Sequence, residues 1–419
     1  MAKVINKYKW AEGAKLDEHS KKKHKILKEY FTEYLKTRCI LPQQEKFRLA
    51  IIDGFSGAGI YECGSYGSPL LFVQTLKDAL NEINIGRTAQ GLRLMDIECT
   101  FIFNDKNKPA MEQLKKNVAP LHAEINQNEK HLHIRFEYFS KKFDQVFPEI
   151  KRMLQTLKYG NVIFNLDQCG HSLVNPEVIR EIMRSWGSAE VFLTFLIGPL
   201  LTYLSTNQDN DKVLAKMPDV QKKVFSLLSG DAGKLLSKEE YLGYAEKFVY
   251  DYLKACAPYV SPFSINNPDG WRYWFMHFAN SPRARQVYNN VQHANSSLQA
   301  HFGRSGLHML SYDPKHEGQL YLFDSSSRER AKKDLYDDIP RLISQHGDAL
   351  TVEEFYSISY SETAAHSDDI HEMIIENPDV EVITPKNHER RKANTIKPTD
   401  ILKIKDQKSM FPLFKKSKR

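Results

Sequence analysis

Strongly apolar segments alternate with amphipathic segments over the first half of the chain. Five segments are nearly all apolar, as expected for strands covered on both faces of a sheet: 47–53, 99–105, 131–137, 161–167 and 190–197. Between them, apolar residues recur at helical spacing, for example over 68–83, where Ser68 is the expected N-cap and Pro69 the first helical residue. The alternation predicts a parallel, doubly wound α/β sheet.

The pattern changes after residue 200. Residues from about 200 to 255 predict a helical insertion, and two strands within 259–279 flank Asn-Pro-Asp-Gly, which is typical of a hairpin turn. From 330 to 405, three helices and a basic two-stranded hairpin predict a winged-helix-like domain, with 386–392 as its wing.

Four regions follow from this pattern. We expect an N-terminal helical segment over 1–45, an α/β domain over 46–325, the winged-helix-like domain over 330–405 and a basic tail over 406–419. The third helix of the winged-helix-like domain is acidic, which is a poor composition for reading a DNA groove. This domain is therefore either a nucleic-acid contact or a module that packs on the core or on a partner.

Composition and charge are typical of a soluble globular protein. The 419 residues are 41% apolar, and 59 basic and 52 acidic side chains give a formal net charge of +7. We expect a cytoplasmic location and no membrane association, because no apolar run can span a bilayer and no signal region is present. The basic clusters at 21–25, 388–392 and 414–419 suit a polyanion or a solvated face. Five cysteines without paired spacing predict no disulfide framework and no metal site.

A glycine-rich turn follows the first predicted strand. The segment Asp53-Gly54-Phe55-Ser56-Gly57-Ala58-Gly59 places N–H groups and a carboxylate at the carboxyl end of that strand, where doubly wound folds bind nucleotides. Glycine permits positive φ and close approach of a ligand. The spelling is neither G-x-G-x-x-G nor a P-loop. It resembles the D-x-F-x-G-x-G of methyltransferases that use S-adenosylmethionine, in which the loop holds the methionine part of the cofactor.

The same resemblance implies a Rossmann-like, seven-stranded class I methyltransferase sheet, since five alternating strands closed by a hairpin have that order. Asp105 ends the second strand, where an acid can accept hydrogen bonds from both ribose hydroxyls; a surface turn is the alternative. Phe139 follows the third strand and is a candidate to clasp the adenine, although core packing explains it equally well.

The fourth predicted strand ends in Asn165-Leu166-Asp167-Gln168-Cys169-Gly170-His171. Amino-methyltransferases have Asp/Asn-Pro-Pro-aromatic here, and both prolines and the aromatic residue are missing. Asp167 is the leading acid/base candidate. Cys169 is either a thiol nucleophile of the kind that pyrimidine C5 methylation needs, or an inert buried cysteine. His171 either orients the substrate or caps the next turn.

Several motifs together resemble the three-Cys-motif partner proteins (TcmP). They are Glu18-His19-Ser20 with Lys23 and Ile26-Leu27, Asp53–Gly57 with Gly67-Ser68-Pro69, 165–170, 241–259, and Phe278-Ala279 with Ser281-Pro282. The likeness covers about residues 15–300. It implies a methyltransferase fold and a companion protein with three cysteines spaced as in radical S-adenosylmethionine enzymes. The family usually has Asp-Pro-Phe-Gly within 165–170, so the chemistry of the fourth strand end departs from its pattern.

His19 and Lys23 are four residues apart and share one face of the predicted opening helix. That face either lies over the cofactor, where His19 lines the site and Lys23 meets an anionic substrate or the cofactor carboxylate, or is a solvated basic face.

Two functions are compatible with these residues. The first is a methyltransferase that uses S-adenosylmethionine and acts on nucleic acid, most simply a base, in a phage-defence or mobile-element setting with a radical-type partner. The second is a catalytically silent subunit that keeps the fold and supports a partner enzyme. The missing prolines favour the second function, whereas the set of Asp53, Gly57, Gly59 and Asp105 favours the first.

Overall fold

The computed structural model of the protein describes residues 14–167, 174–195, 247–266, 272–295, 298–301, 304–310, 319–322 and 325–405. These residues form two compact units that divide near residue 324, and the short stretch 304–310 belongs to the second unit. Each unit is described by itself below. The expected insertion lies largely outside the described residues, and the expected basic tail lies outside them entirely.

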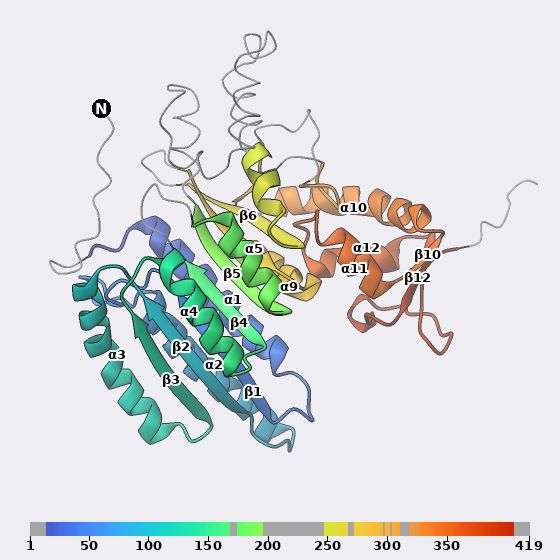
Figure 1. The fold of residues 1–419 in the computed structure, drawn as a ribbon. Helices are drawn as coiled ribbons and strands as arrows, with labels where there is room; N and C mark the ends of the chain where they lie inside the picture. The colour runs from blue at the N-terminus through green and yellow to red at the C-terminus, as the bar shows by residue number, and fades with distance from the viewer. Residues whose placement is uncertain are drawn as a thin grey trace, which may run out of the picture. The chain divides into compact units, whose positions relative to one another are not determined.

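A nine-stranded sheet forms the centre of the first unit (Figure 1). The strands are β1 (Lys46–Asp53), β2 (Asp96–Asn104), β3 (Leu132–Phe139), β4 (Asn161–Leu166), β5 (Ser188–Phe195), β6 (Tyr259–Asn266), β7 (Arg272–Ala279), β8 (Leu298–His301) and β9 (Gln319–Leu322). Their order is β3-β2-β1-β4-β5-β7-β6-β8-β9. The neighbours among β1 to β5 are parallel, and β7 is antiparallel to both β5 and β6.

The first seven positions of this order are those of the class I methyltransferase sheet. The predicted fold class is therefore confirmed by the topology. The difference from the expectation is at one edge, where β8 and β9 pair antiparallel and extend the sheet beyond the seven expected strands.

Helices cover both faces of this sheet. On one face lie α1 (Glu18–Arg38), α2 (Ser68–Ala89), α3 (Lys108–Asn128) and α9 (Pro282–Ala294), whose buried apolar residues join one core cluster with the sheet. On the other face lie α4 (Phe143–Thr156) and α5 (Pro176–Ser185) (Figure 1). The rings of Phe143 and Phe147 on α4 pack edge-on against Phe164 of β4. Both faces of the central parallel strands are thus buried, which explains their long apolar runs. The edge strand β3 is partly exposed, and its sequence alternates between apolar and polar residues.

The opening helix α1 belongs to the core and is not an appendage. Its buried apolar residues recur at helical spacing: Ile26, Leu27, Tyr30, Phe31, Tyr34 and Leu35. Most of its lysines lie on the opposite, exposed side, but Lys23 is buried. The helix ends at Arg38, and the N–H of the C-cap residue Cys39 donates to the carbonyl of Leu35.

The described residues of the second unit form three α-helices, one 3-10 helix and a three-stranded sheet. These elements are α10 (Ser325–Gln345), β10 (Ala349–Thr351), α11 (Val352–Ser359), α12 (Ser367–Glu376), β11 (Val380–Ile383), η5 (Ala393–Thr395) and β12 (Ile401–Ile404). The strands have the order β10-β12-β11. The three expected helices and the two-stranded hairpin are present, together with the additional strand β10. Assignment of this unit to the winged-helix class stays a prediction.

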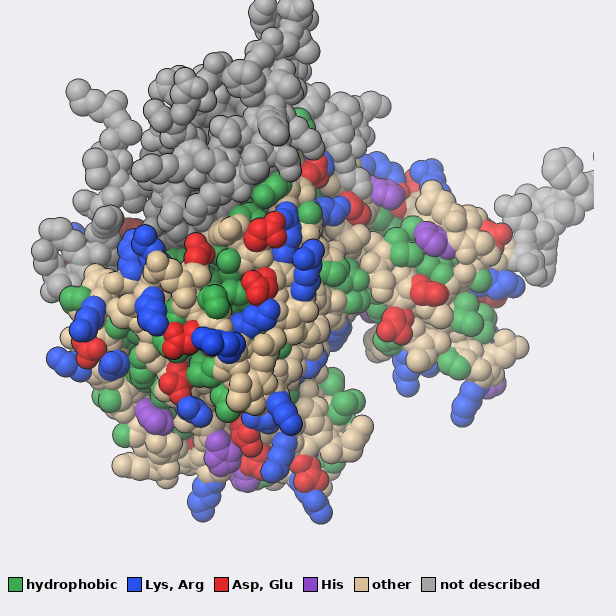
Figure 2. All heavy atoms as spheres, in the orientation of Figure 1, with side chains coloured by type: hydrophobic (Ala, Val, Ile, Leu, Met, Phe, Trp, Pro, Cys, Tyr) green, Lys and Arg blue, Asp and Glu red, His purple; other side chains and the backbone are tan. Residues whose placement is uncertain are grey.

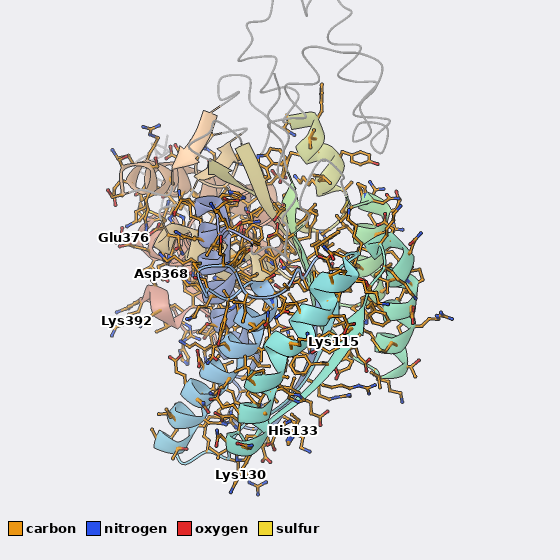
Figure 3. The ribbon with its side chains drawn as sticks, turned by 90° about the vertical axis from the view of Figure 1, so that its left-hand side faces the viewer. Lys115, Lys130, His133, Asp368, Glu376 and Lys392 are labelled. Atoms are coloured by element: carbon orange, nitrogen blue, oxygen red, sulfur yellow. The ribbon has the colours of Figure 1, made fainter. Side chains whose placement is uncertain are left out.

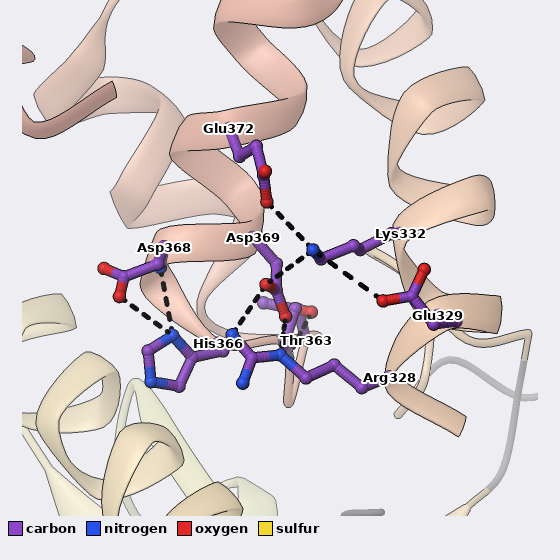
Figure 4. A network of polar contacts seen from close by, with 9 residues as sticks. Arg328, Glu329, Lys332, Thr363, His366, Asp368, Asp369 and Glu372 are labelled. Carbon is purple, nitrogen blue, oxygen red and sulfur yellow. Dashed lines mark hydrogen bonds and ion pairs between the residues drawn. The ribbon is translucent and has the colours of Figure 1, made fainter. Parts of the chain in front are cut away.

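Acidic residues of α12 attach this helix to α10 (Figure 4). The side chain of Asp369 is 3% exposed and accepts hydrogen bonds from Arg328 at 2.6 and 2.8 Å. Lys332 lies 3.6 Å from Asp369 and donates to Glu372 at 2.9 Å. Because these carboxylates are neutralised by α10, the acidic composition of α12 serves packing inside the unit.

The remaining acids of α12 face solvent. Asp368, in the first turn, is 79% exposed, and Glu376 is the last residue of the helix (Figure 3). Exposed carboxylates repel phosphate groups. The interpretation of α12 as a groove-reading helix is therefore disfavoured, and the basic segment after β11, which includes Lys392, is the better candidate for a polyanion.

Candidate cofactor and active site

The carboxylate of Asp53, at the end of β1, lies in the protein interior. It is 0% exposed and accepts hydrogen bonds from the hydroxyl of Ser68 at 2.6 Å, the amide of Asn165 at 3.1 Å and the N–H of Phe55 at 3.1 Å. Burial raises the pKa of Asp53 to about 6, and the three hydrogen bonds oppose this shift. The side chain joins β1, β4 and the start of α2. A contact between Asp53 and a cofactor stays a prediction.

The N-cap of α2 differs from the predicted one. The N-cap residue is Gly67, and its N–H donates to the carbonyl of Gly59 at 2.8 Å. Ser68 is already helical, so its hydroxyl is directed to Asp53 and not to the helix backbone. The expected N-cap at Ser68 is therefore wrong by one residue.

Glycines of the loop after β1 are required mainly by the protein's own packing. A Cβ on Gly54 would lie 2.9 Å from side-chain atoms of Leu166 and Phe143. Gly59 has φ +80°, and a Cβ there would lie 2.4 Å from Leu114. Gly57 also has a positive φ, 59°. At 54 and 59 the glycines admit neighbouring side chains, so the interior fixes the path of the loop. That the loop also admits a ligand stays a prediction.

Ser56 is a second buried anchor of the loop. Its hydroxyl donates to the carbonyls of Asp53 at 3.0 Å and Asn104 at 3.2 Å, and its N–H donates to the same Asn104 carbonyl at 3.0 Å. Phe55 is half-buried, with its ring 5.9 Å from that of Phe143. The side chain of Ser56 therefore ties the tips of β1 and β2 together.

Asp105 meets the glycine loop at the carboxyl edge of the sheet. Its Oδ2 accepts a hydrogen bond from the N–H of Gly57 at 3.1 Å, and its Oδ1 accepts one from the N–H of Asn107 at 2.8 Å. The side chain is only partly buried. Phe139, also partly buried, ends the neighbouring strand β3, and its carbonyl accepts the N–H of Asp105 at 3.4 Å. The tips of β1, β2 and β3 thus converge, as the sequence predicts.

Lys23 and Asp167 form an ion pair across this edge. Lys23 Nζ donates to the two carboxylate oxygens of Asp167 at 2.7 and 2.5 Å, and the two side chains are 6% and 24% exposed. Burial alone would raise the pKa of Asp167, but the charge and the hydrogen bonds of Lys23 outweigh it and lower the pKa. An ionised, cation-bound carboxylate accepts hydrogen bonds well but is a weak general base. The expected face of α1 does lie at this edge, although Lys23 meets a protein carboxylate there.

Two histidines of α1 accompany this ion pair. Burial lowers the pKa of His19, and the charge of Lys23 acts in the same direction. Burial likewise lowers the pKa of His24, to about 4. The imidazole of His24 lies 5.8 Å from the ring of Tyr61, in the loop that follows the glycines. Both histidines are therefore neutral near pH 7. Cys169 and His171 lie outside the described residues.

No family model and no curated protein matches the chain. Three solved structures resemble parts of it at 10% identity. LPL1258 from Legionella pneumophila aligns over 61% of this chain and 85% of its own length, with a TM-score of 0.31. A protein from Clostridium thermocellum proposed to be an rRNA-methylase aligns over 59% and 95%, with a TM-score of 0.25.

The third, PKMT2 from Rickettsia typhi in complex with AdoHcy, aligns over 60% of this chain and 53% of its own, with a TM-score of 0.25. Scores this low support no conclusion about the ligand or substrate of the present chain.

Among the described residues, no helix has the length and apolar character needed to cross a bilayer. Within the same residues, no group of three or more His, Cys, Asp or Glu side chains is arranged to hold a metal ion.

Sequence reasoning missed the buried amides that organise the site. Asn104 donates to the carbonyls of Gly54 at 3.0 Å and Lys141 at 3.1 Å, and Asn165 donates to Asp53. A signal was available: each asparagine directly follows three apolar residues near the carboxyl end of its strand, where an unpaired amide would be costly to bury.

We expect the stability of the wild-type protein relative to Asp53→Asn to fall as the pH rises from about 4 to about 7. A carboxyl whose pKa is raised on folding, here from 3.8 to about 6, holds its proton more tightly in the folded state. Its contribution is present below the unfolded pKa and is lost as the pH rises through the folded value. The shift corresponds to about 3 kcal/mol.

Urea unfolding of both proteins across this pH range measures the difference. Asp78→Asn, which changes an exposed carboxylate on α2, is the matched control and should show no such trend. A difference between wild type and Asp53→Asn that does not change with pH would contradict the shifted pKa.

Proposed function

We propose that this chain is a methyltransferase that binds S-adenosylmethionine at the carboxyl ends of β1 and β2 and acts on nucleic acid, most simply on a base. The proposal is carried by one observation, the 3.1 Å hydrogen bond from the N–H of Gly57 to Asp105. It brings a loop with a fixed main-chain path next to a partly exposed carboxylate, at the edge where doubly wound sheets bind nucleotides.

The residues at this edge fit an adenosyl group. A carboxylate has about four acceptor positions, and the N–H groups of Gly57 and Asn107 take one on each oxygen of Asp105. The remaining positions suit the two ribose hydroxyls. Main-chain atoms of 54–59 and the partly buried ring of Phe139 complete the set. When bound, the cofactor would supply a methyl group on a sulfonium, whose sulfur leaves as a neutral thioether when the methyl is transferred.

The contribution of the chain is orientation. Asp167, held ionised by Lys23, can accept a hydrogen bond from an N–H of the methyl acceptor and so direct its lone pair. In-line displacement depends mainly on this positioning, because reactants held in a near-attack geometry need little further assistance. Lys23 acts through Asp167 and is therefore a positioning residue.

A catalytically silent binding subunit is the second candidate. It is favoured by the Lys23–Asp167 pair, which occupies the carboxylate otherwise free for the acceptor. The resemblance to the three-Cys-motif partner proteins suggests a companion with a radical-type cluster and a role in phage defence, in which this chain would support the chemistry of its partner.

Asp105→Ala should weaken binding of S-adenosylmethionine and S-adenosylhomocysteine by about tenfold or more, because the variant cannot make charge-assisted hydrogen bonds to the ribose. Asp105→Asn, which keeps the size of the side chain and one acceptor oxygen, should have a smaller effect. Isothermal titration calorimetry measures both. Glu112→Ala, an exposed acid on α3, is the control and should bind like wild type. Equal affinity in wild type and Asp105→Ala would remove Asp105 from the site.

Asp167→Ala should lower methyl transfer to nucleic acid by about a hundredfold while leaving the cofactor affinity within about twofold. Lys23→Met should shift the acidic limb of the pH–rate profile to higher pH, because a cation no longer lowers the pKa of Asp167. Transfer of a labelled methyl group from S-adenosylmethionine to DNA and to RNA is the readout. Wild-type protein that binds the cofactor but transfers nothing would favour the silent subunit.

The segment between β11 and β12 supplies the proposed contact with nucleic acid. Arg391 is 85% exposed, with Glu389 at 3.6 Å, and Lys392 is also exposed. Arg390 is different, because it pairs with the fully buried carboxylate of Asp400 at 3.0 and 3.3 Å. Removing the chain from 388 onward would therefore also remove a structural ion pair. On the visible face of the first unit, basic and acidic side chains are interspersed, which suits a phosphate backbone less well (Figure 2).

The double variant Arg391→Gln/Lys392→Gln should weaken nucleic-acid binding and lower the slope of log K against log salt by about two, one unit for each phosphate that is no longer neutralised. Fluorescence anisotropy with labelled single- and double-stranded oligonucleotides over a salt series gives both values. Arg93→Gln, which changes an 81% exposed arginine of the first unit, is the matched control. An unchanged slope in the double variant would place the nucleic-acid interface elsewhere.

A further inference from the structure

A pocket lies at the opposite edge of the first unit's sheet from the proposed cofactor site. Its volume is about 600 Å³, and it is lined by residues from the amino ends of β1, β4 and β5, the last turns of α1 and the first turns of α9. Ligand pockets in proteins typically measure about 300–1,000 Å³. The proposed function uses none of its lining residues.

The charged side chains of the lining are mainly basic. Arg38, Lys46, Arg48 and Arg283 contribute to the wall, against the single carboxylate of Glu190. Arg48 is paired with Glu98 at 2.8 Å. Arg38 and Arg283 donate to the neutral amide oxygens of Asn161 and Gln286. The pocket therefore carries an excess of positive charge.

The position of Arg283 adds to this excess. It lies in the first turn of α9, a turn without acidic residues, whose N–H groups already carry partial positive charge. A cation at this end of a helix is unfavourable by itself. An anion bound in the pocket would compensate the guanidinium and the helix end together.

The floor of the pocket is polar and buried. Glu190 is 6% exposed and accepts hydrogen bonds from the hydroxyl of Tyr30 and, at 3.0 Å, from Nε2 of His277. Tyr34, also 6% exposed, lines the pocket, and its hydroxyl has no hydrogen-bond partner within the described residues. A buried hydroxyl without a partner needs an explanation. A polar group of a ligand beside Tyr34 would give the hydroxyl a hydrogen-bond partner after a small shift of the tyrosine ring.

The rim of the pocket is apolar and unusually exposed. Ile40 is 70% exposed and Leu41 is 51% exposed, and both contribute to the lining together with the buried Phe47 and Val287. Large apolar side chains at the mouth of a basic pocket suit an apolar body that covers them, since their contact with water is then removed.

We propose that this pocket binds a small amphipathic organic anion, with its acidic group held by Arg38 and Arg283 and its apolar body against Ile40 and Leu41. The charge excess selects an anion, the rim selects an apolar body, and the volume limits the ligand to the size of a small molecule. The site is independent of the methyl-transfer site, so its test does not depend on the proposed function.

The probe is 8-anilinonaphthalene-1-sulfonate, an aromatic anion whose fluorescence rises in apolar surroundings. Its uncharged analogue N-phenyl-1-naphthylamine has the same aromatic body without the acidic group. We expect the sulfonate to bind at least about tenfold more tightly than the analogue, since only the sulfonate can form charge-assisted hydrogen bonds with the arginines.

Variants assign the binding to this pocket. Arg38→Gln/Arg283→Gln should weaken the sulfonate by about tenfold or more and leave the neutral analogue nearly unchanged, whereas Ala284→Trp should fill the pocket and weaken both. Arg135→Gln, which changes a 59% exposed arginine on β3, is the matched control, and thermal unfolding verifies that each variant is folded. Equal binding of the two dyes, or sulfonate affinity that neither pocket variant lowers, overturns the proposal.

Discussion

The buried carboxylate of Asp53 is the joint on which the carboxyl edge of the sheet depends. It receives one hydrogen bond from the start of α2, one from the tip of β4 and one from the loop it opens. A carboxylate without exposure is stable only when its acceptor positions are filled. The three donors are therefore held at fixed positions relative to β1, and the loop leaves the strand along a single path.

The path of the loop after β1 determines which main-chain groups its outer side presents to a ligand. Side chains of Leu166 and Phe143 fill the space where a Cβ of Gly54 would lie, so the inner side of the loop is closed by the core. Gly57, with its positive φ, directs its N–H to the carboxylate of Asp105. A site whose main chain is set by the interior needs little reordering when it binds, and this reduces the entropic cost of binding.

The sequence is sufficient to predict seven strands of the first unit and the meeting of the glycine loop with Asp105, because apolar periodicity reports directly on burial within each element. The order of these strands follows from the resemblance to class I methyltransferases, and β8, β9 and β10 are not predicted. It is insufficient where a side chain finds its partner in a distant element. Lys23 and Asp167 are separated by 144 positions, and the pattern around Lys23 equally suits a solvated face. Glu190 stands in an apolar strand, which signals a buried carboxylate without revealing that Tyr30 and His277 accompany it.

The relation between α1 and the ion pair at its N-terminal end follows from the magnitudes of the two interactions. Burying an apolar side chain of average size contributes about 1.5–3 kcal/mol, and the apolar stripe of α1 buries six of them against the sheet and the helices α2 and α9. An ion pair removed from water contributes little net stability, because desolvation offsets most of the attraction. The stripe therefore positions the helix, and the Lys23–Asp167 pair is not needed for that purpose. What the pair does determine is the charge at the tip of β4: an ionised carboxylate whose cation is supplied by the first helix of the chain. A pair that fixes a charge at a site edge while contributing little to folding is better explained by chemistry at that edge than by stability.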